Sequence, residues 1–391
     1  MNITQQGVIT LLKSAVLQKP LPLPVEFDIE RAVEQVKKHH MTALLYEGAI
    51  LCGVSGQLPI MQRLFRDYCK SVIVNERQMR QLYSILAAFD ANGIDYMMLK
   101  GSKMKALYPK PELRAMGDAD ILIRMEQYDR IKPLMENMGM REGSVTDHEL
   151  HWYQQSLMVE LHSKLIPSYN KDFYAYFGDG WFLAQKGQGS QYSMNAEDEM
   201  VYLFTHFAKH YRDGGIGCRH VLDLWVFLRS NPHINEEKVM GELEKLQLRE
   251  FYENIRRIID VWFADKVSDK KTDFISDFIF ASGSWGTGES RTASIAVRDQ
   301  SHQKGSFRAR VVYFLRYAFP TVNVLQEKYR ILKRAPWMLP LVWIYRPFYK
   351  LLRKGEWEDI GRHTKNLKDI NPENLQNRQQ ALQYVGLDYN F

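Results

Sequence analysis

The chain has 391 residues, 45% of them hydrophobic and 25% charged, an ordinary composition for a soluble protein with a sizeable core and two or three domains. Its three cysteines are far apart and form no metal knuckle, the N-terminus lacks the pattern of a secretory signal, and no apolar run approaches the roughly 20 residues that cross a bilayer. We therefore expect a cytoplasmic protein with reduced thiols. The net charge of +6 is uneven, because residues 307–354 carry +10 and the rest of the chain carries −4.

Helical patterns fill the N-terminal region, 1–92. Apolar residues recur three and four positions apart over 29–51, and a second helical pattern runs from about 59 to 89. It ends at Asn92-Gly93, a strong stop and turn signal.

The pattern changes in the segment 93–190. An apolar run from Ile94 that ends at a glycine predicts a strand, and GSKMKALY after it predicts a short helix. Alternating acidic and apolar residues from Asp118 predict a second strand, followed by a helix that stops at Gly139 and a further strand from Ser156. We expect an α/β (α+β) fold, with a small mixed-sheet core between helical N- and C-terminal regions.

Three segments follow this core. Asn195 is suited to cap a helix with an acidic first turn, and helical patterns continue to about residue 263, so 191–280 is predicted to be a helical domain. Residues 281–306 are rich in serine, glycine and polar residues and are predicted to form a loop or linker. Residues 307–391 form a basic, aromatic-rich C-terminal region.

Asp118 and Asp120 are the first residues that indicate chemistry. Side chains two apart in a strand share one face, about 7 Å apart along the backbone, and two carboxylates held so repel each other unless a cation lies between them. Mg²⁺ prefers one or two carboxylates with phosphate oxygens and water, and two such ions can activate a hydroxyl and stabilise leaving pyrophosphate. Taken alone, an Asp-x-Asp sequence is better explained by a solvated strand edge.

Residues before the acidic pair favour a phosphate site. Gly101 and Ser102 follow a strand and begin a helix, where backbone N–H groups can approach phosphate. Lys100 and Arg114 flank the acids and could offset phosphate charge. Each of these features also has a plainer explanation, an ordinary turn glycine or surface cations.

Glu160 is a candidate third carboxylate. Strand alternation places Glu160 and His162 on one face, with Val159 and Leu161 on the other. An acid there could bind a second metal ion and help to deprotonate an acceptor hydroxyl. Considered alone, Glu160 is as readily a solvent-facing strand residue.

The stretch MMLKGSKMKALYPKPELRAMGDADILI, with VELH about 40 residues later, resembles the uncharacterised bacterial nucleotidyltransferase family of the DNA polymerase β-like superfamily. That family shows a strand ending in Leu-Lys-Gly, a Tyr-Pro, an arginine shortly before an Asp-x-Asp strand, and later an acid followed by Leu-His. The resemblance implies that Gly101 and Ser102 occupy phosphate-loop positions. It also implies that Asp118 and Asp120 are the metal-ligand pair and Glu160 the third carboxylate.

Lys100 and Arg114 match motif positions whose roles the resemblance leaves open. The chain departs from the superfamily pattern at Lys103 and Lys105, which crowd the start of the helix and could either contact phosphate or be exposed. It also departs in having Glu160, rather than an aspartate, as the third carboxylate.

The resemblance implies an enzyme, a metal-dependent nucleotidyltransferase that uses Mg²⁺, with Mn²⁺ as the alternative. It would move a nucleoside monophosphate from a nucleoside triphosphate such as ATP to an acceptor and release pyrophosphate. We expect the acceptor to be a small molecule or a polysaccharide precursor rather than nucleic acid. Two other classes stay open, a metal-dependent glycosyltransferase that uses a nucleotide-sugar and a non-catalytic nucleotide-binding regulatory protein of the same fold.

Two pairs of histidines are less specific indications of a metal site than the acidic residues. The motif HELH at 148–151 lacks the four-residue spacing of zinc peptidases and is expected in a loop or strand without zinc. His206 and His210 share a helical face, but further ligands would have to come from residues such as His220 or Asp223. A structural or substrate-contacting role is the preferred interpretation of the pair.

The basic segment 307–354 mixes eleven Lys/Arg and one acid with large aromatic residues. This composition is typical of an element that lies on an anionic surface, so peripheral contact with the inner membrane face is one prediction. A nucleic-acid groove is the competing functional interpretation. The simplest alternative is a helix pair that buries its apolar face, and the prolines at 320, 336, 340 and 347, which interrupt any long amphipathic helix, favour it.

Overall fold

The computed structural model describes residues 1–283, 286, 290–294, 306–326, 329, 331–352 and 357–387. The chain forms two compact units, one from Met1–His210 with Ile216–Ser284 and the other from Tyr211–Gly215 with Trp285–Asn390. The five segments expected from the sequence stay a prediction, because these two units divide the chain more coarsely. The expected linker, 281–306, lies mostly outside the described residues.

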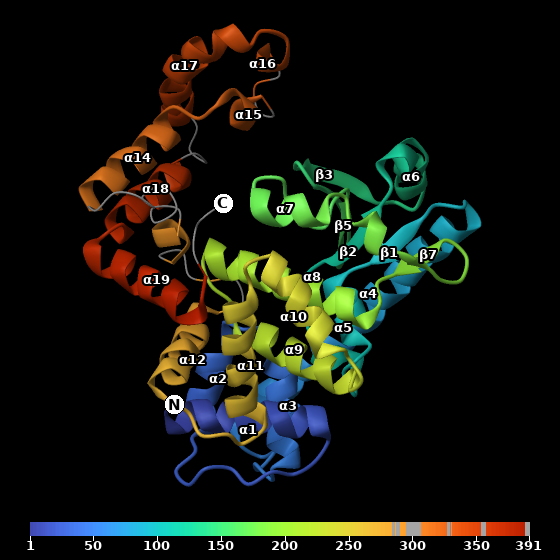
Figure 1. Cartoon of the computed structure of the whole chain (residues 1–391), viewed down its shortest axis with the longest axis vertical. Coiled ribbons are helices and arrows are strands. Elements are labelled where there is room, and N and C mark those ends of the chain that lie inside the picture. The colour runs from blue at the N-terminus through green and yellow to red at the C-terminus, as the bar shows by residue number, and fades with distance from the viewer. Residues whose placement is uncertain are drawn as a thin grey trace. The chain divides into compact units, whose positions relative to one another are not determined.

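A seven-stranded mixed sheet lies in the first unit (Figure 1). Its strands are β1 (Tyr96–Met98), β2 (Ala119–Ile123), β3 (Arg141–Val145), β4 (Glu149–Gln154), β5 (Leu157–His162), β6 (Gln185–Lys186) and β7 (Gln191–Ser193). The spatial order is β3-β4-β5-β2-β1-β7-β6, with β2 parallel to β5 and antiparallel to β1. The predicted mixed α/β fold is therefore confirmed.

One face of the sheet is buried under two helices, α4 (Pro59–Ala91) and α6 (Tyr128–Asn137). Helix α4 contributes apolar residues at helical spacing, and alternate residues of the strands complete the cluster. This core includes Leu82, Ile85, Leu86 and Phe89 from α4, Ile131 and Met135 from α6, and Ala119, Ile121, Ile123, Leu150, Trp152, Val159 and Leu161 from the strands. Val159 and Leu161 thus lie on the apolar face, as predicted.

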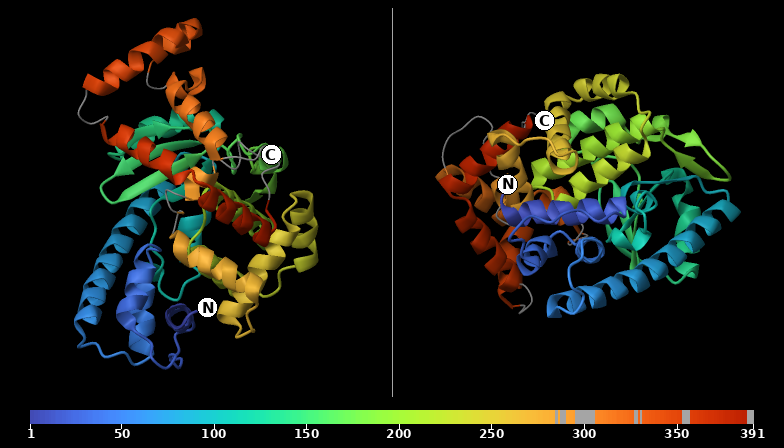
Figure 2. Two further views of the ribbon diagram at one scale, coloured as in Figure 1. Left: turned by 90° about the vertical axis from the view of Figure 1, so that its left-hand side faces the viewer. Right: turned by 90° about the horizontal axis from the view of Figure 1, so that it is seen from below.

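Three helices precede α4, namely α1 (Ile3–Leu17), α2 (Ile29–Lys37) and α3 (Thr42–Leu51). The helical pattern over 29–51 forms two of them, because the backbone turns at His40, where φ is +54°. Helix α4 begins at Pro59 and ends just before Asn92-Gly93, as predicted, and Figure 2 shows its length (light blue) beside the N-terminal helices.

The remaining helices of the first unit come after β1 in the chain, either between strands or after the last strand. They are α5 (Lys100–Lys105), α7 (Lys171–Phe177), α8 (Ala196–Asp213, whose last residues belong to the second unit), α9 (Cys218–Ser230), α10 (Glu236–Lys245), α11 (Arg249–Phe263) and α12 (Lys270–Ser282), with short 3₁₀ turns at Pro111–Leu113, Met125–Gln127 and Trp181–Leu183. The predicted cap of α8 is confirmed, because Asn195 Oδ1 accepts a hydrogen bond from the Asp198 N–H at 2.9 Å. Stacking of Trp225 on Phe263, with ring centroids 4.4 Å apart, joins α9 to α11.

The second unit is helical where it is described. Its helices are α14 (Ser306–Ala318), α15 (Val322–Leu325), α16 (Ile331–Arg334), a 3₁₀ turn (Pro336–Met338), α17 (Leu339–Leu352), α18 (Trp357–Asp369) and α19 (Pro372–Val385). Pro320 and Pro336 separate helices as expected, whereas Pro347 lies inside α17. Over the described ranges, none of the helices has the length and apolar character needed to span a bilayer.

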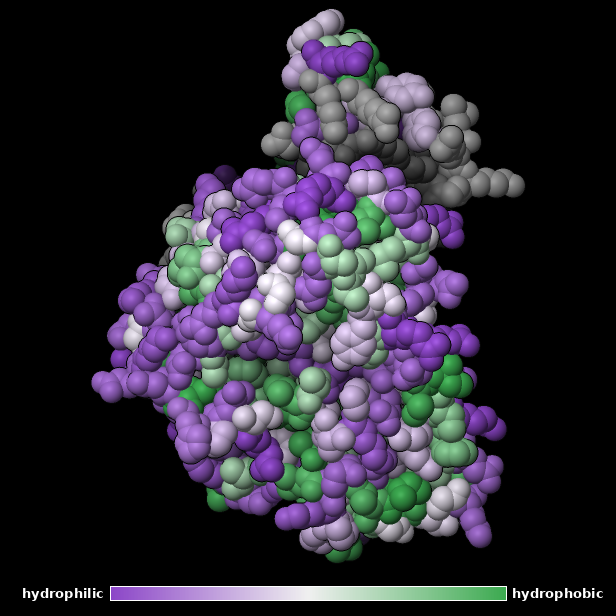
Figure 3. Space-filling model, turned by 90° about the vertical axis from the view of Figure 1, so that its right-hand side faces the viewer, coloured by the Kyte–Doolittle hydropathy of each residue, from purple (hydrophilic) through white to green (hydrophobic). Residues whose placement is uncertain are grey.

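Hydrophobic residues on one face of the molecule lie in separate patches among hydrophilic ones (Figure 3). Most of these patches are in the lower half of the view, where Figure 1 places the N-terminal helices. Scattered patches of this kind are normal on a protein surface and need no functional explanation.

Candidate active site

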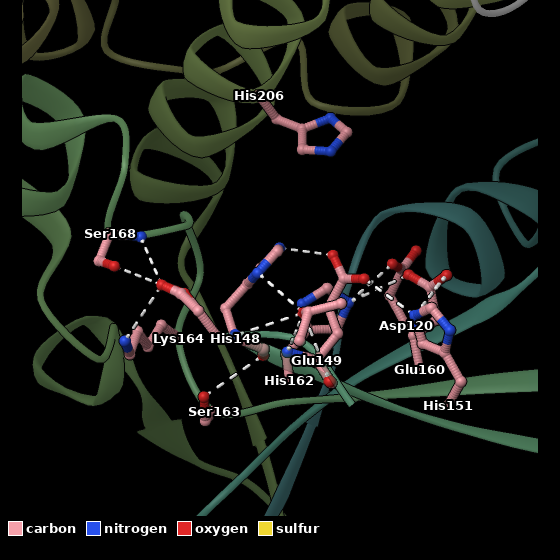
Figure 4. A network of polar contacts seen from close by, with 12 residues as sticks. Asp120, His148, Glu149, His151, Glu160, His162, Ser163, Lys164, Ser168 and His206 are labelled. Carbon is pink, nitrogen blue, oxygen red and sulfur yellow. Dashed lines mark hydrogen bonds and ion pairs between the residues drawn. The ribbon is translucent and has the colours of Figure 1, made fainter. Parts of the chain in front are cut away.

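Three adjacent strands gather polar side chains on the face of the sheet opposite α4. Strand β5 lies between β2 and β4, and the register pairs Glu160 with Asp120 on one side and with His151 on the other. Glu149 and His162 form a second pair between β4 and β5. Figure 4 shows these side chains pointing toward one another above the strands. Strand alternation therefore brings together groups that are 42 residues apart or less in sequence.

Asp120 lies at the centre of an ion-pair network. It is 4% exposed, and its Oδ1 accepts hydrogen bonds from Lys100 Nζ and His162 Nε2, each at 3.0 Å. Burial acts to raise the pKa of Asp120, but Lys100 and His162 outweigh it and hold the pKa below its usual range. Asp120 is thus a carboxylate at neutral pH, the form that binds cations.

Asp118 lies directly before β2 and has no such cationic partner at hydrogen-bond distance among the described contacts. Burial, followed by repulsion from Asp120 and Glu160, raises the pKa of Asp118 to about 6. The three carboxylates predicted from the sequence are therefore close enough to perturb one another. A divalent cation between them would relieve this repulsion.

Lys100 and Ser102 lie in α5, a helix of only six residues that directly follows β1. Lys100 has φ +29°, an unusual value for a residue other than glycine, and its ammonium group is the one that reaches Asp120. Ser102 is buried, and its hydroxyl donates a 3.4 Å hydrogen bond to the Leu99 carbonyl. The predicted contacts of Lys100 and Ser102 with a nucleotide stay predictions.

Gly101 borders the acidic pair directly. A Cβ atom placed on Gly101 would lie 3.4 Å from the Asp118 carbonyl oxygen and 3.8 Å from Asp120 Oδ2. These are ordinary van der Waals separations, so the fold itself does not require a glycine here. Gly101 is buried and its carbonyl accepts the Arg114 hydrogen bond, so the missing side chain only reduces the bulk beside the carboxylates.

Arg114 is held by protein groups at each of its guanidinium nitrogens. Its Nε and Nη2 donate to the two carboxylate oxygens of Asp223 on α9, each at 2.9 Å, and its Nη1 donates to the Gly101 carbonyl at 2.9 Å. This two-pronged ion pair ties α9 to the backbone of Gly101. Arg114 thus lies next to the predicted phosphate loop, and direct contact with phosphate stays a prediction.

The two lysines that depart from the superfamily pattern are not free surface cations. Lys105 is 2% exposed, and its Nζ donates to the Arg114 carbonyl at 2.6 Å. Lys103 forms an ion pair with Glu199 at the start of α8. Both lysines therefore tie α5 to its surroundings.

Reasoning from the sequence missed the contribution of β4. The HELH motif was predicted to lie in a loop or strand without zinc; it forms part of β4, where His151 Nε2 lies 3.0 Å from Glu149 Oε2 and 3.6 Å from Glu160 Oε1. The alternation of Glu149 and His151 with the buried Leu150 and Trp152 is the signal that could have placed both polar residues on the face of Glu160.

His206 and His210 share one face of α8, as predicted, and their Nε2 atoms are 3.0 Å apart. Burial lowers the pKa of both imidazoles well below the usual value, so both are neutral at physiological pH. Figure 4 shows His206 on the side of the sheet that carries the carboxylates. Asp223, a possible further ligand by sequence, forms an ion pair with Arg114 instead.

The donor atoms on this face suit a divalent metal ion. Among the described residues, Asp120, Glu160 and His162 offer one ligand atom each within 4.8 Å of one another. Carboxylate oxygens are the ligands that Mg²⁺ and Mn²⁺ prefer, and imidazole broadens the choice to later transition metals. The residues present therefore fit a metal-dependent reaction without identifying the ion.

Clustered carboxylates on one face of a sheet, beside a short helix that begins with Lys100 and Gly101, are an arrangement suited to metal-dependent nucleotide transfer. Residues 25–264 match the family described as uncharacterised nucleotidyltransferase, and the chain belongs to that family. It is therefore an enzyme of the nucleotidyltransferase class, as the sequence resemblance implied. A search of curated proteins found no match.

Among solved structures, the chain is similar to one titled as the solution structure of the antibiotic-resistance factor ANT(2'')-Ia. The sequence identity is 14% and the TM-score 0.32, and the alignment covers 47% of this chain and 97% of the other.

Proposed function

We propose that the protein transfers a nucleoside monophosphate from a nucleoside triphosphate to an acceptor hydroxyl, with Mg²⁺ or Mn²⁺ as cofactor. In this reaction the acceptor oxygen forms a bond to the α-phosphorus, the bond from that phosphorus to the bridging oxygen breaks, and pyrophosphate leaves. The observation that carries the proposal is the pairing of Asp120 with Glu160 across β2 and β5, with Asp118 near enough for their charges to raise its pKa. Family membership supports the transfer chemistry.

Each residue of the site has a distinct part in this proposal. Asp118 and Asp120 hold the metal, which when bound neutralises phosphate charge and stabilises the leaving pyrophosphate. Glu160 accepts the proton of the acceptor hydroxyl. Lys100 keeps Asp120 ionised, and the absence of a side chain at Gly101 leaves room for the phosphates to approach.

We expect a small molecule or a polysaccharide precursor, rather than nucleic acid, as the acceptor. Outside residues 307–354 the chain carries a net charge of −4, so the part that holds the site has no excess of positive charge. Binding of a nucleic-acid backbone depends on such an excess.

A thermal-shift screen tests the proposal against its rivals. Nucleoside triphosphates should raise Tm in the presence of Mg²⁺ but not with a chelator, and this Mg²⁺-dependent shift should vanish in Asp118→Asn. Stabilisation by nucleotide-sugars instead would favour a glycosyltransferase. A triphosphate response without pyrophosphate release for any acceptor tested would favour a non-catalytic nucleotide-binding protein.

We also propose a cytoplasmic location with contact to an anionic membrane surface through residues 307–354. The support is an apolar face of the segment Trp337 to Tyr345 that points to solvent, with Trp337 76%, Leu341 55% and Ile344 64% exposed, in a segment of net charge +10. Vesicle flotation tests it. The protein should float with anionic but not neutral vesicles, and a Leu341→Ser, Ile344→Ser variant should not float. Failure to float, or flotation that survives both substitutions, would refute the proposal.

A further inference from the structure

A second set of metal-ligand side chains lies at the edge of the proposed active site, and its donors include an imidazole. Glu149, His151 and Glu160 offer ligand atoms that all lie within 4.8 Å of one another. His151 Nε2 is the middle atom of the three, 3.0 Å from Glu149 and 3.6 Å from Glu160. The strand register fixes this arrangement, because His151 on β4 lies directly opposite Glu160 on β5.

The ring of His151 is already oriented for ligation. Its Nδ1 lies 2.7 Å from the Ser144 hydroxyl of the neighbouring strand β3, so Nε2 is the nitrogen that faces the two carboxylates. Histidines that bind metals almost always hold their second nitrogen in such a hydrogen bond, which sets the tautomer and the ring orientation.

The distances also match a small, four-coordinate ion. Zinc binds imidazole nitrogen and carboxylate oxygen at about 2.0–2.2 Å, so two ligand atoms at a tetrahedral angle are about 3.3–3.5 Å apart. The observed separations of 3.0 and 3.6 Å bracket this value. The side chains of Glu149, His151 and Glu160 are 13–17% exposed, so an ion can reach them from solvent.

The imidazole of His162, on the neighbouring strand β5, has one ring nitrogen without a hydrogen-bond partner among the described residues. His162 is 1% exposed, and in the described part of the chain its Nδ1 meets no hydrogen-bond partner. One ligand atom of His162 lies within 4.8 Å of ligand atoms from His148 and Glu149. A buried polar atom without a partner is costly, so this face of the sheet has a polar group that the described protein contacts do not satisfy.

We propose that Glu149, His151 and Glu160 form a binding site for a transition-metal ion of the Zn²⁺ class, separate from the Asp118–Asp120 pair. Imidazole favours such ions, whereas Mg²⁺ prefers oxygen ligands and an octahedral shell. The site shares Glu160 with the active site. An ion bound there engages an oxygen of Glu160, so zinc slows nucleotide transfer; this consequence alone rests on the proposed function.

Cobalt(II) titration of the full chain tests the site without relying on activity, because four-coordinate cobalt absorbs visible light far more strongly than the hydrated ion. The wild-type protein should develop this absorption with one equivalent of Co²⁺ and lose it when Zn²⁺ is added. His151→Ala should weaken binding at least about 10- to 100-fold, and Ser144→Ala, which removes the second-nitrogen contact, about 10-fold or more. His233→Ala, at an exposed histidine far along the chain, is the matched control and should bind as wild type.

Two results would overturn the proposal. One is a wild-type protein that gives only the weak absorption of hydrated cobalt, or titrates identically to a folded His151→Ala. The other is loss of cobalt absorption in Asp118→Asn, which would assign the ion to the aspartate pair. Cobalt binding that depends on His151 in a protein that never transfers nucleotide would uphold this site while refuting the proposed function.

Discussion

Gly101 offers a substitution that separates folding from nucleotide binding. A Cβ at this position meets the Asp118 carbonyl oxygen at 3.4 Å, Arg114 Nη1 at 3.5 Å and Asp120 Oδ2 at 3.8 Å, all ordinary contacts. Glycine inside a helix is roughly 0.5–1 kcal/mol less favourable than alanine, so Gly101→Ala should leave stability unchanged or raise it by up to about 1 kcal/mol.

The same methyl group would cover the backbone that a triphosphate is proposed to approach. Overfilling a fitted site costs typically about 1–3 kcal/mol, so the affinity of Gly101→Ala for a Mg²⁺–nucleoside triphosphate should fall about 5- to 150-fold. Urea denaturation and isothermal titration with the triphosphate measure the two effects on one preparation.

Gly241 in α10 provides the matched control, since a Cβ there would meet nothing within 4 Å. Gly241→Ala should give a similar gain in stability with unchanged nucleotide affinity. If Gly101→Ala folds and binds the triphosphate as tightly as wild type, the backbone of Gly101 does not contact phosphate. If it unfolds, the steric reasoning itself is wrong.

Three further predictions follow from the burial and charge of individual side chains. Without metal, Asp118→Asn should raise the free energy of unfolding by about 1–3 kcal/mol, because burial and like charges destabilise the Asp118 carboxylate. Asp120→Asn should lower it by about 2 kcal/mol or more, because Lys100 loses its partner. Equal shifts of the two variants in urea melts would contradict these different electrostatic environments. Glu160→Gln should reduce kcat more than it raises KM for the triphosphate, since a base acts on the acceptor in the transition state, and steady-state kinetics would expose equal losses. Burial lowers the pKa of His39 from 6.5 to about 4, so the folded state binds fewer protons than the unfolded state between these values and stability is lost as pH falls through this window. Between pH 7 and 5 the loss from this group is about 2 kcal/mol, and His39→Gln should be less acid-sensitive by that amount in urea melts at the two pH values.

The sequence was informative wherever a pattern is local. Helix α4, from Pro59 to the Asn92-Gly93 stop, and the alternation around Glu160 could be predicted because capping, turns and strand periodicity depend on neighbouring residues. The motif from Lys100 to Asp120 also indicated the enzyme class, which family membership confirms.

Long-range pairing was the part that could not be predicted. Asp118 and Asp120 are equivalent in an Asp-x-Asp pattern, yet only Asp120 meets Lys100 and His162, because strand order and the turn at α5 decide which carboxylate the cations reach. The pairing of Arg114 with Asp223, 109 residues away, depends on the packing of α9. No local pattern contains that information.

Alternate residues of β2 and β5 face opposite sides of the sheet, one apolar and one polar. Odd positions such as 119, 121, 159 and 161 are buried in the apolar core, and even positions such as 118, 120, 160 and 162 carry the polar groups. A library that varies only 118 and 160 therefore leaves the apolar core and the Asp120 ion pairs unchanged, whereas a one-residue insertion within either strand would exchange the two faces at once. Point substitutions can thus reshape this site gradually, but length changes in these strands cannot.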